Sequence, residues 1–247
     1  MTVIVNQPFG IGDVIWCQTI VRRVANGNPI LWPVFPQFVD GLNRAYPDIT
    51  FIDWRTLKIN YDRQDQYTIT LPEYGDCTVL PLRHADTIMK VPYTDCMKSK
   101  YMLYGMDWQD WRESAKWLKD GLPELQLSKM MRMGSCAGDK FSIINTTFGS
   151  DSQLIAKIPV NALLSPSIFM SSIPGYSLFD WAMLLQEANE IHTVSTSIIY
   201  LLEMLELKAK EIHLYSRKRI ENGVLIDGNS LDNVSYILQK HKYILHP

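Results

Sequence analysis

The sequence has 247 residues, of which 47% are hydrophobic and 20% are charged, and its formal net charge is −2 at pH 7. Such a chain can bury one large core or two smaller ones, and its composition excludes intrinsic disorder. Without an excess of positive charge, nucleic acid is not expected as a partner. No signal peptide and no transmembrane segment is visible, so we expect a cytoplasmic protein, with peripheral contact to a membrane left open.

The cysteines and histidines are dispersed along the sequence. No two cysteines form a Cys-x-x-Cys pair, so free thiols in a reducing compartment are expected instead of disulfides. The histidines are equally scattered, and the sequence predicts no metal site. These residues are Cys17, Cys77, Cys96 and Cys136, and His84, His192, His213, His241 and His246.

Strands and helices alternate in the first third of the chain. The pattern predicts a strand at 2–6, a helix at 13–25, a strand at 29–33, a helix at 37–45 and a strand at 49–53, with further strand candidates at 66–71 and 77–81. This alternation indicates βαβ units and a parallel sheet. The strands lack polar alternation, which is typical of strands covered by helices on both faces.

Residues 93–133 form a mostly helical stretch that is rich in aromatic side chains. Trp108, Trp111 and Ala115 share one face at helical spacing, and Tyr93, Tyr101, Tyr104 and Trp117 lie nearby. Two interpretations stay open. The rings either pack in a core, as most large aromatic side chains do, or form an exposed surface on which a sugar can stack.

A second α/β pattern follows the small and polar segment 134–140, which is the best candidate linker. It predicts strands at 141–145, 167–170, 190–194 and 211–215, and helices at 178–188 and 197–207. We therefore expect two domains of similar construction, at residues 1–135 and 140–247.

The first strand leads into a glycine-containing turn, Gly10-Ile11-Gly12-Asp13, at the start of a predicted helix. Strand, tight turn and helix N-terminus open many nucleotide-binding α/β domains, although the third glycine of the dinucleotide fingerprint is missing. The glycines allow a close backbone approach to a bound group. Asp13 is then either a carboxylate that acts on a substrate or a simple helix cap.

Two loops in the second half resemble phosphate-binding loops. The first follows the strand at 141–145 and contains Thr146, Thr147, Gly149 and Ser150, with Lys157 close behind. The second contains Ser195, Thr196 and Ser197 and leads into a helix, whose N-terminal N–H groups favour an anion. Ordinary helix capping by Ser195 or Thr196 is the alternative interpretation of the second loop.

The order of these motifs resembles the heptosyltransferase-type glycosyltransferases of the ADP-heptose:LPS type, as a distant and compact relative. The resemblance rests on Gly12-Asp13-Val14-Ile15, on the strand and small-residue loop at 145–150, on Lys157-Ile158-Pro159, on Ser177-Leu178 and on residues 195–200. In the last segment the family has Asp-Thr-Gly-x-x-His. Here Ser195 stands for the acid, Ser197 for the glycine and Tyr200 for the histidine, which leaves the contacts to the donor phosphates open.

The resemblance implies an α/β protein with two Rossmann-like domains that face each other across a cleft, the GT-B fold. It implies transfer of a sugar from a nucleotide-diphosphate sugar to a hydroxyl of a glycan, glycolipid or glycoprotein, with the hexosyl, pentosyl or heptosyl class undetermined. Asp13 would be the general base of an inverting reaction, and Gly10 and Gly12 would belong to the acceptor-binding domain. Thr196 and its neighbours would hold the donor phosphates.

No metal and no other cofactor is expected, since the Asp-x-Asp motif of metal-dependent glycosyltransferases is absent. His192 and the basic cluster 217–219 are either further donor-binding groups or structural and solvated residues. A non-catalytic glycan-binding protein is one alternative function. A Rossmann-type enzyme using NAD or S-adenosylmethionine is another, although segment 31–36 lacks the acid that would hold ribose hydroxyls.

Overall fold

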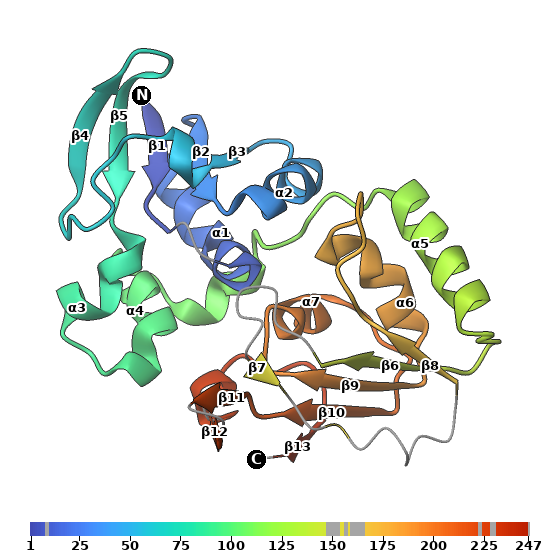
Figure 1. Ribbon diagram of the computed structural model, residues 1–247. Coiled ribbons are helices and arrows are strands. Elements are labelled where there is room, and N and C mark those ends of the chain that lie inside the picture. The colour runs from blue at the N-terminus through green and yellow to red at the C-terminus, as the bar shows by residue number, and fades with distance from the viewer. Residues whose placement is uncertain are drawn as a thin grey trace. The chain divides into compact units, whose positions relative to one another are not determined.

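The computed structural model describes residues 1–7, 10–146, 154–155, 158, 166–221, 224–227 and 231–246. The chain divides into two compact units, Met1–Lys119 and Asp120–Pro247 (Figure 1). The boundary therefore lies before the expected linker at 134–140, and helix α5 (Gly121–Gly134) belongs to the second unit. Arg132 of α5 explains this placement, because it pairs with Glu187 and its guanidinium lies 4.7 Å from the ring centre of Phe141.

The first unit contains a five-stranded sheet with the order β3-β2-β1-β5-β4. The strands are β1 (Thr2–Val5), β2 (Ile30–Val34), β3 (Thr50–Asp53), β4 (Tyr67–Leu71) and β5 (Gly75–Leu80). All neighbours are parallel except β4, which is antiparallel to β5. The hydrophobic runs of β1 and β2 are buried, as predicted for strands covered on both faces.

The helices of the first unit are α1 (Ile11–Ala25), α2 (Val39–Ala45), α3 (Ala85–Met89) and α4 (Cys96–Met102), with short 3₁₀-turns at Pro36–Phe38, Trp54–Thr56, Leu82–His84, Tyr93–Asp95 and Trp108–Arg112. Helix α1 begins two residues before the predicted position and buries Val14, Cys17 and Val21. It ends at Asn26, whose φ of 47° is left-handed and stops the helix.

The aromatic stretch of the first unit is mainly core. Tyr101, Trp111 and Ala115 are fully buried. The indole of Trp16 in α1 contacts Tyr101 edge-on at 5.4 Å and also lies 5.4 Å from the ring of Trp111. These contacts support the core-packing interpretation and leave no exposed stacking surface on Tyr101 or Trp111.

The second unit contains a parallel five-stranded sheet with the order β13-β10-β9-β6-β8. Its strands are β6 (Ser142–Asn145), β8 (Ser167–Phe169), β9 (Glu190–Val194), β10 (Glu211–Tyr215) and β13 (Tyr243–His246). A small antiparallel sheet joins β7 (Leu154–Ile155), β11 (Lys218–Glu221) and β12 (Val224–Asp227). The four main predicted strands are thus confirmed, whereas β13 was not predicted.

Two predicted helices of the second unit are shorter than expected. The first starts as a 3₁₀-turn, Leu178–Trp181, and continues as α6 (Ala182–Glu187), and Ser177 and Asp180 form a capping box at its start. The second is α7 (Ile198–Met204), whose last carbonyls lie 3.0 and 3.1 Å from His241 Nε2. A further 3₁₀-turn spans Leu231–Val234. Figure 1 shows α6 and α7 on one face of this sheet.

None of the helices in the described ranges has both the length and the hydrophobicity needed to cross a membrane.

Candidate substrate sites at the carboxyl ends of the two sheets

Each main sheet has a point at which the strand order reverses. In the first unit β1 lies between β2, which follows it along the chain, and β5. In the second unit β6 lies between β8, which follows it, and β9. Ligands of open α/β sheets bind beyond the carboxyl ends of the strands at such a reversal. The carboxyl ends of β1 and β6 are therefore the candidate substrate sites.

The turn after β1 holds Asp13 in the first turn of α1. Gly10 precedes this helix at its N-cap position and has a φ of 38°, which side-chain-bearing residues rarely adopt. A Cβ atom at Gly10 would also lie 3.5 Å from Asp13 Oδ2. No side chain caps α1, so Asp13 is not its N-cap. Gly12 is buried in the same turn.

Asp13 forms an ion pair with Lys100 of α4. Lys100 Nζ donates to Asp13 Oδ1 at 2.5 Å, and the side chains are 6% and 25% exposed respectively. Burial alone lowers the pKa of Lys100, but the neighbouring Asp13 carboxylate and Cys17 outweigh it and hold that pKa above its usual value. Lys100 is therefore a buried ammonium that fixes one oxygen of Asp13. Lys100 was not among the predicted site residues, because nothing in its local pattern marks it.

The end of β6 is joined to the loop after β9 by a side-chain amide. Asn145 Nδ2 donates to Thr193 Oγ1 at 2.9 Å and to Thr196 Oγ1 at 3.4 Å. The backbone N–H of Ile198 also donates to Thr196 Oγ1, at 3.5 Å, so Thr196 contributes to the start of α7. Thr196 thus lies at the strand-order reversal, next to Ser197, which is the N-cap residue of α7 and makes no side-chain cap hydrogen bond.

Arg217 brings a positive charge to the same loop. Its Nε donates to the carbonyl of Ser195, and Arg217 itself is the second residue after the end of β10. The backbone N–H of Ser195 donates to the carbonyl of Tyr215 at 3.1 Å, which fixes the loop against β10. Next to Arg217, the buried hydroxyl of Ser216 has no hydrogen-bond partner in the described parts of the chain. A guanidinium, an amide and hydroxyl groups together provide the chemistry for binding an anion.

The remaining predicted site residues are partly exposed, buried or outside the described part of the chain. Thr146 follows β6 and is partly exposed at the same edge, as is Ser197 before α7. Ser195 and Tyr200 are buried, the latter inside α7. Thr147, Gly149, Ser150 and Lys157 lie outside the described residues.

His192 does not lie at this edge. It is in the middle of β9, where the alternation of side chains puts it on the opposite sheet face from Thr193. Its Nδ1 lies 3.1 Å from the hydroxyl of Tyr215, and burial lowers its pKa.

No protein-family model matches the sequence, and no curated protein is significantly similar to it. Among solved structures, the iron-containing dodecameric glycosyltransferase TibC from enterotoxigenic E. coli H10407 has a TM-score of 0.50 at 13% identity, over 87% of this chain. This chain spans only 57% of the length of TibC.

Two structures of E. coli heptosyltransferase WaaC are also similar. The one with ADP has a TM-score of 0.40 at 13% identity, and the one with ADP-2-deoxy-2-fluoro heptose has 0.37 at 12%. Each match covers 87% of this chain, and 87% and 89% of the respective WaaC chain. The two Rossmann-like units and the likeness to TibC confirm the expected α/β fold class of the GT-B glycosyltransferases.

Proposed function

We propose that this protein is a glycosyltransferase that moves a sugar from a nucleotide-diphosphate sugar to a hydroxyl group of a glycan, glycolipid or glycoprotein. The N-terminal unit binds the acceptor, and the C-terminal unit binds the nucleotide-sugar. The observation that carries this proposal is the complementary chemistry of the two strand-order reversals. One presents the Asp13 carboxylate, and the other presents the Arg217 guanidinium with the Asn145 amide.

Asp13 is the proposed general base. Its Oδ1 accepts the hydrogen bond from Lys100, which leaves Oδ2 to receive the proton of the acceptor hydroxyl. In a single displacement the acceptor oxygen bonds to the anomeric carbon as the bond from that carbon to the diphosphate oxygen breaks. Attack opposite to the leaving group inverts the anomeric configuration. Lys100 does not touch the substrate and acts as a positioning residue.

The leaving diphosphate is stabilised by groups after β6, β9 and β10. Arg217 supplies positive charge, and Thr146, Thr196 and Ser197 supply hydroxyl groups at the same edge. In this proposal the guanidinium and the N–H groups compensate the developing negative charge, and the chemical step is metal-independent.

The test is nucleotide release from a panel of nucleotide-sugars in the presence of EDTA, with and without candidate acceptors. We expect one donor to be turned over and Asp13→Asn to lose about 10²- to 10⁴-fold in kcat, the usual contribution of a general base. Full turnover by a folded Asp13→Asn enzyme would show that Asp13 is not the base. Binding of a glycan with no turnover of any donor would favour a non-catalytic glycan-binding protein. Binding of NAD or S-adenosylmethionine alone would overturn the proposal.

A further inference from the structure

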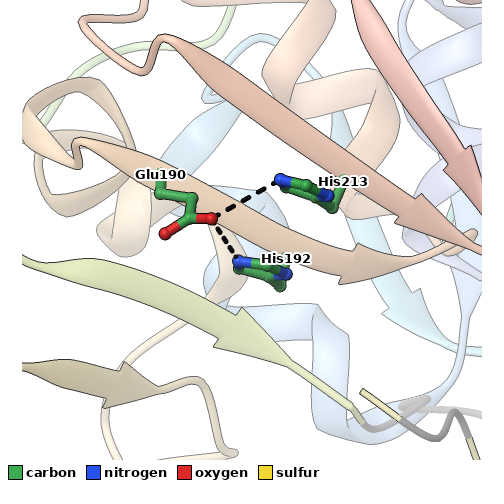
Figure 2. Close-up of side chains that lie close together, drawn as sticks. All are labelled: Glu190, His192 and His213. Atoms are coloured by element: carbon green, nitrogen blue, oxygen red, sulfur yellow. Dashed lines mark ion pairs between the residues drawn. The ribbon is translucent and has the colours of Figure 1, made fainter. Parts of the chain in front are cut away.

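One face of the second sheet carries an unusual group of ionisable side chains. Glu190 and His192 are two residues apart on β9, so both point to the same face. The strand register pairs His192 with His213 of β10, and the two imidazole rings stack at 4.4 Å. Figure 2 shows the carboxylate of Glu190 directed at both rings.

The nitrogen and oxygen atoms of these side chains lie close enough together to bind one ion. Glu190 Oε1 lies 2.9 Å from His192 Nε2 and 3.5 Å from His213 Nε2. Three potential ligand atoms, one from each residue, all lie within 4.8 Å of one another. Glu211 Oε2 lies 3.2 Å from His213 Nε2 and offers a fourth oxygen.

The outer nitrogens of both rings are held by neighbouring side chains. His192 Nδ1 lies 3.1 Å from the hydroxyl of Tyr215, and His213 Nδ1 lies 2.9 Å from His246 Nε2. His213 Nε2 also forms a hydrogen bond of 3.2 Å with the carboxylate of Glu211, so an ion must replace the proton on this nitrogen. Once Nδ1–H donates to the outer partner, Nε2 carries the lone pair. Metal-binding histidines have this arrangement, because the outer hydrogen bond fixes the tautomer and the ring orientation.

The inner nitrogen of His192 is not satisfied by the carboxylate. The 2.9 Å contact to Glu190 lacks hydrogen-bond geometry, and His192 Nε2 has no hydrogen-bond partner among the described residues although its side chain is only 6% exposed. A buried lone pair beside a carboxylate oxygen is stabilised by a cation between the two.

We propose that Glu190, His192 and His213 bind a divalent transition-metal ion, with Glu211 as a fourth ligand. Imidazole nitrogen and carboxylate oxygen are ligands that Zn²⁺ and its neighbours in the first transition row accept. Tetrahedral coordination with bonds of about 2.0–2.2 Å puts ligand atoms about 3.3–3.6 Å apart, so Glu190 Oε1 and His192 Nε2, which are 2.9 Å apart, must separate slightly on binding. The partly exposed Glu190 and the exposed Glu211 give an ion access from solvent.

The metal site is separate from the proposed donor site. His192 and Thr193 point to opposite faces of β9, and Glu190 is the first residue of that strand, far from its carboxyl end. An ion here ties β9 to β10 and, through the contact between His213 and His246, to the C-terminal strand β13. Its role is to stabilise the second unit, and it goes beyond the proposed transfer reaction.

The experiment measures binding of Zn²⁺ to the chelator-stripped full chain by competition with a chromophoric chelator, together with the visible spectrum of Co²⁺ and the melting temperature. We expect one ion per chain, a Co²⁺ absorption typical of nitrogen and oxygen ligands, and a rise in melting temperature. His192→Asn and His213→Asn should each weaken Zn²⁺ binding at least tenfold. Tyr215→Phe, which removes only an outer hydrogen bond, should weaken it about 10- to 100-fold.

The matched control is His84→Asn in the first unit, which removes one histidine outside the cluster and should bind Zn²⁺ like the wild type. Circular dichroism shows whether each variant is folded. Glu190→Gln and Tyr215→Phe keep the test decisive if a histidine variant does not fold. Less than one ion bound per wild-type chain, or unchanged affinity in folded Glu190→Gln and Tyr215→Phe, would overturn the metal site.

Discussion

Lys100 Nζ donates a hydrogen bond of 2.5 Å to Asp13 Oδ1, joining α4 to the first turn of α1 across 87 positions of the sequence. The ammonium is almost completely buried and the carboxylate is one-quarter exposed. The buried Lys100 therefore fixes the orientation of the Asp13 carboxylate. The carboxylate itself remains accessible to a substrate. This relationship leads to separate expectations for activity and for stability.

Replacing Lys100 should lower the rate of sugar transfer without changing donor binding. In Lys100→Met the carboxylate of Asp13 loses the group that orients it, and a misplacement of about 1 Å can cost about 10²-fold in rate. We expect kcat to fall about 10- to 100-fold while KM for the nucleotide-sugar stays constant. Lys100→Arg, which retains the charge, should recover part of the rate. An unchanged kcat in folded Lys100→Met would rule out a positioning role.

The same ion pair should show strong coupling in stability. Asp13→Ala leaves a buried ammonium without its partner, which typically costs about 3–5 kcal/mol. Lys100→Met leaves a carboxylate that water still reaches, so its cost should be smaller. The double variant Asp13→Ala/Lys100→Met should be more stable than Asp13→Ala alone. Urea unfolding at pH 7 measures all four proteins. If the loss of unfolding free energy in the double variant equals the sum of the losses in the two single variants, the pair contributes no coupling energy.

Arg217 should contribute to binding of the donor nucleotide. A charge-assisted hydrogen bond contributes about 1.5–3 kcal/mol, so Arg217→Gln should raise the dissociation constant of the donor nucleotide about 10- to 100-fold. Lys210→Gln is the matched control, because Lys210 is exposed and precedes β10 at the opposite edge of the sheet. Calorimetric titration with the donor identified in the panel measures both variants. If Arg217→Gln and Lys210→Gln bind the donor with equal affinity, Arg217 does not contact the diphosphate.

Asn145 should contribute both to the stability of the carboxyl end of the second sheet and to donor binding. Asn145→Ala removes the donor to Thr193 Oγ1 and Thr196 Oγ1, and we expect a loss of about 1–3 kcal/mol in stability and weaker donor binding. Ser142→Ala is the control on the same strand, since the Ser142 hydroxyl donates to Glu190 on the other sheet face. Thermal unfolding with and without donor separates the two effects. Identical donor affinities in both variants would exclude Asn145 from the site.

Strands were predictable where hydrophobic residues follow one another, as in β1 and β2. Helix ends were less predictable, because tertiary contacts set them. His241, for example, contacts the last carbonyls of α7 from a distant part of the chain. Strand β13 was missed, since its pairing with β10 depends on the folded sheet and its own residues alternate only weakly.

The candidate sites divide in the same way. Asp13 and Thr196 could be proposed as site residues from the sequence because each follows a predicted strand, where the ends of parallel strands meet. Lys100 could not be identified, because a single lysine in a helical stretch carries no signal of its distant partner. The pairing of His192 with His213 arises from strand register, which places residues 21 positions apart side by side. A search for metal-ligand spacing within one segment of the sequence cannot find such a pair, because the two histidines are on different strands.

Cys17 should make the protein sensitive to alkaline pH. Its thiol is fully buried in α1, and burial raises its pKa from 9.0 to about 12. Between these values the unfolded chain releases a proton that the folded chain retains. The free energy of unfolding therefore falls as pH rises, by up to about 1.4 kcal/mol per pH unit from this group.

Cys17→Ala should be less stable at pH 7 because of the cavity it creates, but its stability should fall less steeply above pH 9. Exposed Cys136 provides the control, because Cys136→Ala should keep the wild-type slope. Urea unfolding from pH 7 to pH 11 measures the slopes, and equal slopes for Cys17→Ala and Cys136→Ala would contradict this origin of the alkaline sensitivity.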